Sequence, residues 1–186
     1  MWDDGSGSLT SPALCLHAGR VLILSNTGIL ARVSANGAVE RIWVYPSNNV
    51  NERMNGGREN SRSGELRSDG RWAVATPADG DGFTLILGPE DGEPRRYTGD
   101  GCRGEVLDVV NAVAVLVGGK QITCLDLAGP PTLRWQRQGK DIMTNACAAI
   151  GAGRVLVGAL VDTRERLTLL DLKTGDELSQ KGLSPP

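Results

Sequence analysis

Apolar and polar positions alternate in short runs along this chain, and the stretch from Gly153 to Glu177 shows the unit most clearly. Two apolar runs, Arg154–Leu160 and Leu167–Leu172, flank a polar turn, and a second turn follows at Lys173–Asp176. Apolar runs of about 4–8 residues bounded by Gly, Asp or Asn are typical of β-strands joined by tight hairpins. The pattern therefore predicts consecutive antiparallel strands of one small sheet.

The same outline occurs three more times earlier in the chain. Each copy opens on a Gly-Arg or Asn-Ala pair, at Gly19, Gly70, Asn111 and Gly153, and the intervals between these anchors are 51, 41 and 42 residues. The long interval contains a polar stretch that the other copies lack. Without an insertion of about ten residues, the period is close to the ~40–45 residues of a four-stranded propeller blade. We therefore expect an all-β fold: a β-propeller of about four blades, forming an open arc or part of a larger propeller.

The repeats place strands in each copy of a single propeller domain over 1–186. We expect the copies at roughly 9–45, 59–99, 102–139 and 141–182. The innermost strands are predicted at Ala13–His17, Glu65–Ser68, Val106–Val110 and Cys147–Ile150. The outer strands are predicted at Val39–Tyr45, Glu93–Thr98, Thr132–Gln138 and, in truncated form, Leu178–Lys181. Trp43 and Trp135 stand in outer strands after a glycine turn, so both are expected to be largely buried between neighbouring sheets.

Residues 46–64 differ from the rest of the chain in composition, because they are rich in Asn and Arg and almost free of apolar side chains. Such a segment cannot bury enough surface to offset its ordering entropy, which predicts a mobile insertion. One interpretation is a tolerated surface loop. The other is a partner-contact loop, since long loops on rigid scaffolds often carry function; its contact residues would be Asn48, Asn51, Arg53, Arg58 and Arg62.

Charge and hydropathy exclude several classes of partner. The net charge is −2 and the isoelectric point is near 5.5, which argues against nucleic-acid binding and a polybasic membrane patch. No apolar run reaches the ~18 residues of a membrane span. The N-terminal sequence MWDDGSGSLTS has no basic region followed by an apolar one, so no signal peptide is predicted.

Candidate chemistry is sparse. The four cysteines are far apart in sequence and no C-x-x-C pair occurs, so we expect free thiols at Cys15, Cys102, Cys124 and Cys147. His17 is the only histidine, which disfavours a zinc site or a hydrolase triad. Asp79–Gly82 is better explained as a hairpin turn than as a calcium loop, and Gly99–Gly104 as a connection between blades. We expect no catalytic residue, no cofactor and no metal.

The turn after the last apolar run matches a known repeat. Asp171, Thr174 and Gly175 fit the pattern Ala-x-Asp-x-x-Thr-Gly-Lys-x-x-Trp, with Leu169 in place of Ala and Ser179 in place of Trp. This resembles the pyrroloquinoline-quinone-like propeller repeat, whose members include quinoprotein alcohol dehydrogenases and non-enzymatic BamB-type lipoproteins. Other copies match less closely, keeping Asp126, Gly129 and a displaced Trp135, or Gly37 and a displaced Trp43. The resemblance implies that the Trp packs against a neighbouring blade.

Trp2 extends this comparison to the start of the chain. It precedes Gly19 at nearly the same spacing at which Trp135 precedes Gly153. Trp2 thus occupies the place of the Trp that closes a preceding blade. Together with the short last strand, this predicts an open arc whose end blades expose apolar faces. We expect the chain to belong to a longer propeller or to pair with a second copy through those end blades.

Two functions remain open. The first is a non-catalytic propeller scaffold that binds a protein or peptide partner, and the regular repeats without catalytic residues favour it. The alternative is a fragment of a quinoprotein-type oxidoreductase propeller.

Overall fold

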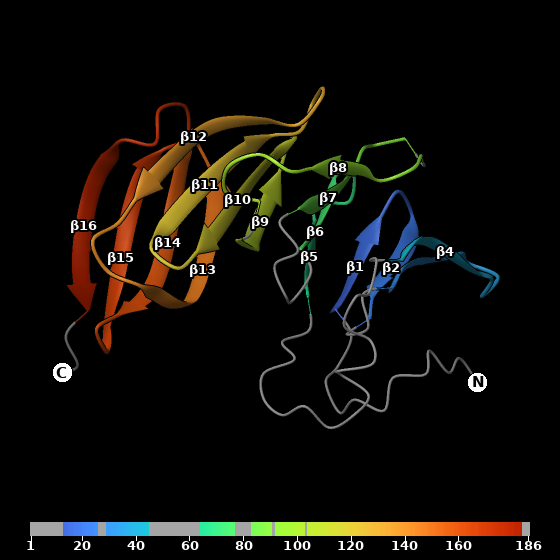
Figure 1. The fold of residues 1–186 in the computed structure, drawn as a ribbon, viewed down its shortest axis with the longest axis horizontal. Helices are drawn as coiled ribbons and strands as arrows, with labels where there is room; N and C mark the ends of the chain where they lie inside the picture. Colours follow the sequence, from blue (N-terminus) through green and yellow to red (C-terminus); the bar gives the residue numbers. More distant parts are fainter. Residues whose placement is uncertain are drawn as a thin grey trace.

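The computed structural model describes residues 13–25, 29–44, 64–76, 83–90, 92–102 and 104–183. These residues form sixteen β-strands in four antiparallel sheets of four strands each, and they include no helix (Figure 1). In every sheet the strands pair in the order in which they occur along the chain. Each sheet is therefore an up-and-down meander, the arrangement of a propeller blade. No helix in the described ranges is long and apolar enough to cross a membrane.

The four blades are numbered in chain order. Blade 1 contains β1 (Ala13–His17), β2 (Arg20–Leu24), β3 (Ile29–Val33) and β4 (Val39–Val44). Blade 2 contains β5 (Glu65–Ser68), β6 (Ala73–Thr76), β7 (Thr84–Leu87) and β8 (Arg95–Tyr97). Blade 3 contains β9 (Glu105–Val110), β10 (Val113–Gly118), β11 (Gln121–Asp126) and β12 (Thr132–Gln138). Blade 4 contains β13 (Met143–Gly151), β14 (Arg154–Val161), β15 (Arg164–Asp171) and β16 (Glu177–Leu183).

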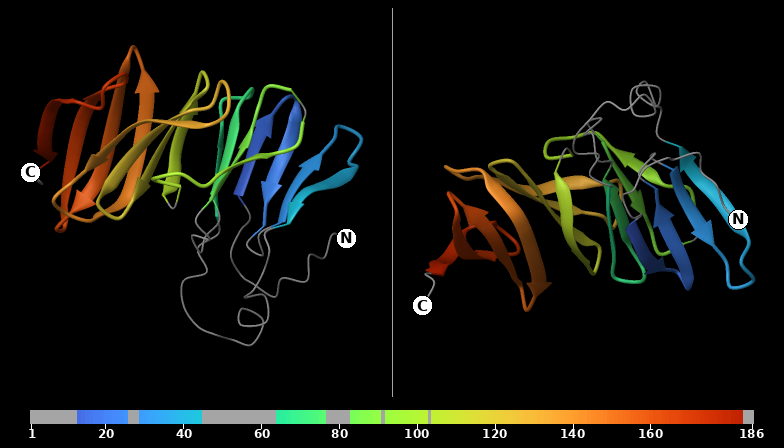
Figure 2. Two further views of the ribbon diagram at one scale, coloured as in Figure 1. Left: turned by 45° about the horizontal axis from the view of Figure 1, so that its top comes forward. Right: turned by 90° about the horizontal axis from the view of Figure 1, so that it is seen from below.

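The blades follow one another in an open row. Their first strands contact in succession, β1 with β5, β5 with β9 and β9 with β13, so these are the innermost strands, as expected. Blades 1 and 4 lie at opposite ends of the molecule in every view (Figures 1 and 2). The prediction of a β-propeller of about four blades in an open arrangement is therefore confirmed.

Three apolar cores hold the four blades together, one at each junction. The first junction buries Leu22, Leu30, Phe83 and Leu85, the second Val106, Leu116, Leu125 and Leu127, and the third Val115, Val155, Val157 and Leu170. Because adjacent side chains on a strand point to opposite faces, each middle blade supplies one set of apolar residues to each neighbour. All four residues of both β6 and β7 are accordingly buried.

The end blades carry apolar side chains on both faces but bury only one of them. In blade 1 the outer face presents Leu14 and Leu16, which are 60% and 67% exposed. We call this surface the blade 1 end face; by register it comprises Leu14, Leu16, Val21, Ile23, Val33 and Val39. The blade 4 end face comprises Cys147, Ala149, Leu156, Leu160, Leu167 and Leu169. The exposed apolar end faces that the repeat predicted are thus present.

Every predicted strand is present, but the bounds of several differ from the prediction. β1, β5 and β12 have the predicted bounds, whereas β8 is shorter than Glu93–Thr98 and β13 is longer than Cys147–Ile150. The last outer strand was expected to be truncated at Leu178–Lys181, but β16 has seven residues, as many as β12. The polar residues of β16 give no apolar pattern from which the strand can be predicted. Backbone pairing with β15 nevertheless extends it to Leu183.

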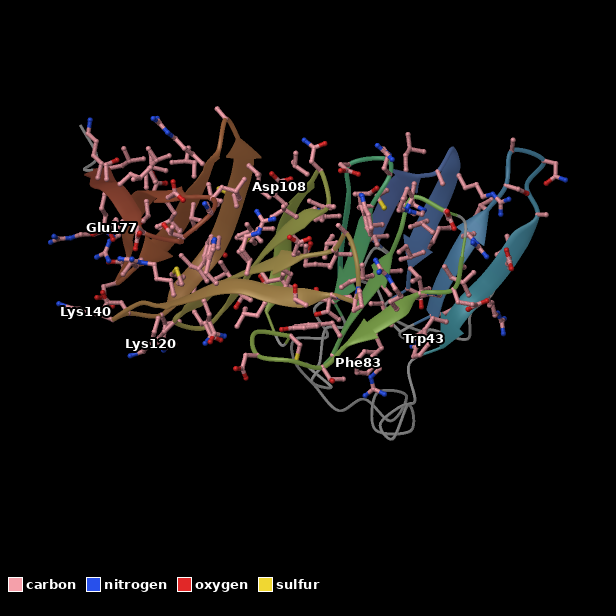
Figure 3. The ribbon with its side chains drawn as sticks, turned by 90° about the horizontal axis from the view of Figure 1, so that it is seen from above. Trp43, Phe83, Asp108, Lys120, Lys140 and Glu177 are labelled. Atoms are coloured by element: carbon pink, nitrogen blue, oxygen red, sulfur yellow. The ribbon has the colours of Figure 1, made fainter. Side chains whose placement is uncertain are left out.

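The two tryptophans of the outer strands differ in burial. Trp135 is buried, with 8% of its surface exposed, as predicted. Trp43 is less completely buried than Trp135, but it too packs against the next blade, as predicted, and meets Phe83 edge-on at 6.3 Å between ring centroids (Figure 3). A register shift lies beside each Trp, between β3 and β4 and between β11 and β12, and each Trp pairs with a buried residue, Leu30 or Cys124. Both rings therefore face the junction with the next blade.

Carboxylates on the inner side of the arc join consecutive blades. Asp69 accepts hydrogen bonds from the backbone N–H groups of Arg71, Trp72 and, across the junction, Asn111. Asp108 of β9 likewise accepts from Ile150 N at 2.8 Å. Both contacts join residues 42 apart, which equals the interval between the last two anchors. The repeat period thus brings a carboxylate of one blade to a backbone donor of the next.

Acid should weaken the junction at Asp69 specifically. Burial raises the pKa of this carboxyl, but the N–H groups of Trp72, Arg71 and Asn111 outweigh it and hold the pKa below its usual value. A lowered folded-state pKa adds stability above the ordinary Asp value of about 3.9, and this part is lost as the pH falls through the folded-state pKa. Asp69→Asn should therefore be less stable than wild type at pH 7, with the difference shrinking toward pH 3. Urea unfolding across this range measures it, with Asp162→Asn in an exposed turn as the control.

Candidate functional site

The outer part of the junction between blades 3 and 4 carries the candidate site. Trp135 and Arg137 lie two residues apart on β12, so both side chains point toward blade 4. The Trp135 indole Nε1 donates to Leu172 O at 2.9 Å. A Cβ on Gly175 would come within 2.6 Å of the indole ring, and this glycine has a φ of +76°. Only glycine therefore fits beneath the ring and adopts this backbone without strain.

The turn that holds Gly175 is shaped by its own polar side chains. The Asp171 carboxylate accepts from Lys173 N at 2.8 Å and Thr174 N at 2.9 Å, and Thr174 Oγ1 donates to Asp176 at 2.7 Å. The N–H groups of Thr174 and Lys173 lower the pKa of Asp171. The residues that match the repeat motif thus shape the turn against which the Trp of the preceding blade packs, as the resemblance implied. We call a turn of this kind, with its glycine beneath the ring, a glycine seat.

Beyond Trp135 the two blades diverge and leave a cleft of about 300 Å³, which we call the blade 3–4 cleft. Its apolar lining comes from both blades, through Ile122, Met143, Val157, Ala159 and Val161. Its polar rim comes from Arg137, Gln138, Lys140, Asp141, Arg166, Thr168, Glu177 and Gln180. The cleft therefore combines apolar and polar lining in about equal measure, and its volume is at the lower end of the usual range for binding pockets.

Two ion pairs cross the rim from one blade to the next. Arg137 Nη2 lies 2.6 Å from Glu177 Oε2, and Arg166 Nη1 lies 3.6 Å from Asp141 Oδ2. All four side chains are about one third exposed, so each pair contributes little to stability, on the order of 0–1 kcal/mol. The pairs instead hold charged groups at the opening of the blade 3–4 cleft. The rim has three cations against two carboxylates, because Lys140 also lines it.

The segment that carries Lys140 and Asp141 is tied to blade 3. Lys120 Nζ donates to Lys140 O at 2.8 Å, and Gly139 N donates to Lys120 O at 2.6 Å. Met143 N also donates to Gly119 O at 2.9 Å. Lys120, Lys140 and Glu177 lie at the same end of the molecule (Figure 3). The connection between blades 3 and 4 is therefore a bonded element of the rim, which pre-orders the cleft.

The residues that the sequence singled out lie elsewhere. The loop residues Asn48, Asn51, Arg53, Arg58 and Arg62 fall outside the described residues, as does the turn at Asp79–Gly82. Gly99–Gly104 joins β8 to β9, as the prediction of an inter-blade connection required. Among the described residues, no three His, Cys, Asp or Glu side chains gather as a metal site.

The cysteines and the histidine serve the fold and form no reactive site among the described residues. All four cysteines are free thiols, as predicted, and burial raises the pKa of Cys15 to about 11 and that of Cys124 to about 12. These two thiols therefore stay protonated at neutral pH and are poor nucleophiles. His17 is 1% exposed, and its Nε2 lies 2.8 Å from Gly88 O in blade 2. This contact across the first junction gives His17 a structural role.

The rim of the cleft was not found from the sequence. Arg137, Asp141, Arg166 and Glu177 are ordinary surface residues in the linear chain. A signal was nevertheless present, because Arg137 and Glu177 are 40 residues apart, close to one repeat period. Residues one period apart on the same strand of consecutive blades lie across a junction, so opposite charges at that spacing indicate an inter-blade pair.

Comparison with known proteins finds structural similarity to β-propellers. No family model matches the sequence, and no curated protein matches it significantly. Among solved structures, the β-propeller domain of Cps50 (Swd1) from Myceliophteria thermophila is similar with a TM-score of 0.60 and 12% identity, over 95% of this chain and 56% of that one. The WD40 domain of SCAP from fission yeast gives a TM-score of 0.55 at 10% identity, over 93% of this chain and 41% of that one.

A bacterial structure is similar to the same extent. PorZ, a surface component of the type-IX secretion system of Porphyromonas gingivalis, gives a TM-score of 0.58 at 16% identity, over 92% of this chain and 22% of that one. The chain thus spans about half or less of the length of each of these three structures. At such identities the likeness concerns the fold alone. This chain has the fold of a segment of a β-propeller.

Proposed function

We propose that this chain is a non-catalytic propeller scaffold that binds an extended peptide or a protein loop in the blade 3–4 cleft. The observation that carries the proposal is the cleft itself, a hollow of about 300 Å³ with an apolar floor and a rim of charged side chains from two blades. Propeller neighbours support a scaffold in general terms, because this fold commonly mediates protein interactions. The cleft indicates where a partner would bind and which side chains would contact it.

The chemistry of the cleft favours one kind of peptide. Ile122, Val157 and Val161 would receive a single apolar side chain, since the hollow is too small for several. The rim cations Arg137, Lys140 and Arg166 outnumber the rim carboxylates, so acidic residues on either side of the apolar one would gain charge-assisted hydrogen bonds. An apolar residue flanked by Asp or Glu is therefore the expected recognition motif.

A random peptide library displayed on cells and sorted against the labelled chain tests the proposal. Sorted clones should converge on the motif of an apolar residue with acidic neighbours, and a synthetic peptide of that sequence should bind in fluorescence anisotropy. Arg137→Glu should weaken its binding at least about tenfold, the equivalent of ~1.4 kcal/mol. The side chain is partly exposed, so the variant should keep its fold.

Arg154→Glu provides the matched control. It makes the same charge reversal at an exposed position of β14 that does not line the cleft, and it should leave binding unchanged. Selected peptides that bind both variants as tightly as wild type would assign the interaction to another surface. A library that yields no enriched sequence would contradict peptide binding by the scaffold.

We also propose that the chain is related to the pyrroloquinoline-quinone-like propeller repeat. It is supported by the packing of Trp135 on Gly175, the contact that the Asp-x-x-Thr-Gly and Trp elements of the motif require. The donor groups for a bound calcium ion do not gather among the described residues, so these residues do not fit a quinone-binding member. Titration with pyrroloquinoline quinone and calcium should leave the absorbance and the melting temperature unchanged. A saturable shift of either would favour the oxidoreductase alternative.

A further inference from the structure

The hairpin between β3 and β4 of blade 1 resembles the turn that receives Trp135 in blade 4, but is one residue shorter. Gly37 has a φ of +81° and Gly175 a φ of +76°. Gly37 N donates to Ser34 O at 2.9 Å, and Gly175 N donates to Asp171 O at 2.9 Å. In each turn the residue that supplies this carbonyl also donates its own N–H across the hairpin, at 3.0 Å in blade 1 and 2.9 Å in blade 4. Blade 1 therefore presents the same kind of glycine seat.

The two glycine seats differ in whether an aromatic ring packs on the glycine. A Cβ on Gly175 would stand 2.6 Å from the Trp135 ring of the preceding blade. A Cβ on Gly37 would meet no described atom within 4 Å. The glycine of blade 4 is explained by the ring that packs on it, because any side chain would displace that ring. The glycine of blade 1 has the same backbone and lies next to the blade 1 end face.

The blade 1 end face corresponds to a surface that is covered inside the chain. Val21 pairs with Val33 in blade 1 as Val155 pairs with Leu170 in blade 4, each pair following the first hairpin of its blade. Val155 and Leu170 are fully buried against blade 3. Their counterpart Val21 is 37% exposed, and Val39, opposite Val33, is 46% exposed. The register thus indicates that the blade 1 end face corresponds to a face that another blade covers inside the chain.

The chain itself carries an aromatic residue at the right distance. Trp2 precedes His17, the last residue of β1, at almost the same spacing at which Trp135 precedes Gly151, the last residue of β13. Trp2 falls outside the described residues. A second copy would not supply the ring, because Ser179 of β16 holds the place that Trp135 holds in β12: each pairs with the matching residue of the strand before it, Leu169 or Cys124. The spacing and the serine both favour the N-terminal segment as the occupant.

We propose that the blade 1 end face is a docking surface for the N-terminal segment of this chain, with the Trp2 ring on Gly37 as the Trp135 ring lies on Gly175. The segment takes the place of the outer strand of a preceding blade. It covers the apolar side chains of β1 and β2 that no described residue covers. Ordering this segment costs conformational entropy, and the burial of the indole together with the apolar side chains of the blade 1 end face acts against that cost.

Fluorine NMR of the full chain labelled with 5-fluorotryptophan tests the proposal. The chain has four tryptophans, and Trp2→Phe identifies the resonance of Trp2. In the wild type this resonance should lie away from its position in the urea-unfolded chain and should be shielded from a soluble nitroxide. Gly37→Val should return it to the unfolded position and expose it to the nitroxide, because the new side chain occupies the seat.

Gly19→Val is the matched control. Gly19 also belongs to blade 1, has a φ of +73° and has no described atom within 4 Å of a built Cβ, so valine there adds the same kind of backbone strain. It lies in the hairpin between β1 and β2, not in the hairpin that forms the seat, and should leave the Trp2 resonance in place. Should Gly37→Val fail to fold, Val39→Ser alters the same face without changing the glycine, and it should weaken the shielding of Trp2.

Three results would overturn the proposal. One is a Trp2 resonance that lies at its unfolded position in the wild type and is broadened fully by the nitroxide. Another is a shielded Trp2 that responds equally to Gly37→Val and Gly19→Val, or to neither. The third is shielding that disappears on dilution, because this would assign the ring to a second copy instead of the same chain.

Discussion

Replacing Trp135 by alanine is expected to lower the free energy of unfolding by about 3–5 kcal/mol, the usual cost of truncating a buried Trp. The ring is 8% exposed and joins blades 3 and 4 through its packing on Gly175 and its hydrogen bond to Leu172 O. The substitution removes both contacts and leaves a cavity at the junction. Urea unfolding monitored by circular dichroism measures the loss.

Two further variants separate the contributions at this junction. Trp135→Phe keeps an apolar ring but loses the hydrogen bond, so it should lie between wild type and Trp135→Ala. Trp43→Ala makes the same truncation in the outer strand of blade 1, where the residue is half-buried, and should cost less. A Trp135→Ala variant that unfolds within about 0.5 kcal/mol of wild type, the range typical of surface changes, would mean that the junction is not formed as described.

Replacing Leu116 by alanine is expected to cost about 2–5 kcal/mol, whereas the same change at Leu156 should cost less than about 1 kcal/mol. Both leucines lie in the second strand of their blades. Leu116 is fully buried between blades 2 and 3, but Leu156 is 41% exposed on the blade 4 end face. Only the first substitution opens a cavity that the surroundings cannot fill.

The pair also tests whether the arc is open in solution. Equal losses at Leu116 and Leu156 would show that another sheet covers the blade 4 end face. Unfolding measured at two protein concentrations identifies its source, because pairing of two copies makes the midpoint depend on concentration. A midpoint that is independent of concentration, together with a small loss at Leu156, is the result expected for an open arc.

Local sequence determined the strands and some of their ends. Apolar runs bounded by turn residues predicted β1, β5 and β12 to the residue, because hairpin turns need left-handed backbone that Gly, Asn and Asp adopt easily. β16 was underestimated, since residues such as Ser179, Gln180 and Lys181 have weak strand preference and form a strand only through pairing with β15. The repeat period then determined the number of blades.

The sequence by itself therefore determined the four-bladed propeller arc, its apolar end faces, the burial of Trp135 and the free state of the cysteines. Only the tertiary structure decided that Trp43 is less buried than Trp135, because the packing between two blades sets how much of each ring is covered. Only the tertiary structure revealed the cleft, since Arg137 and Glu177 meet across two blades from positions 40 residues apart. The reason is physical: turns and strands follow from neighbours in sequence, whereas a site between blades follows from the register and packing of sheets distant along the chain.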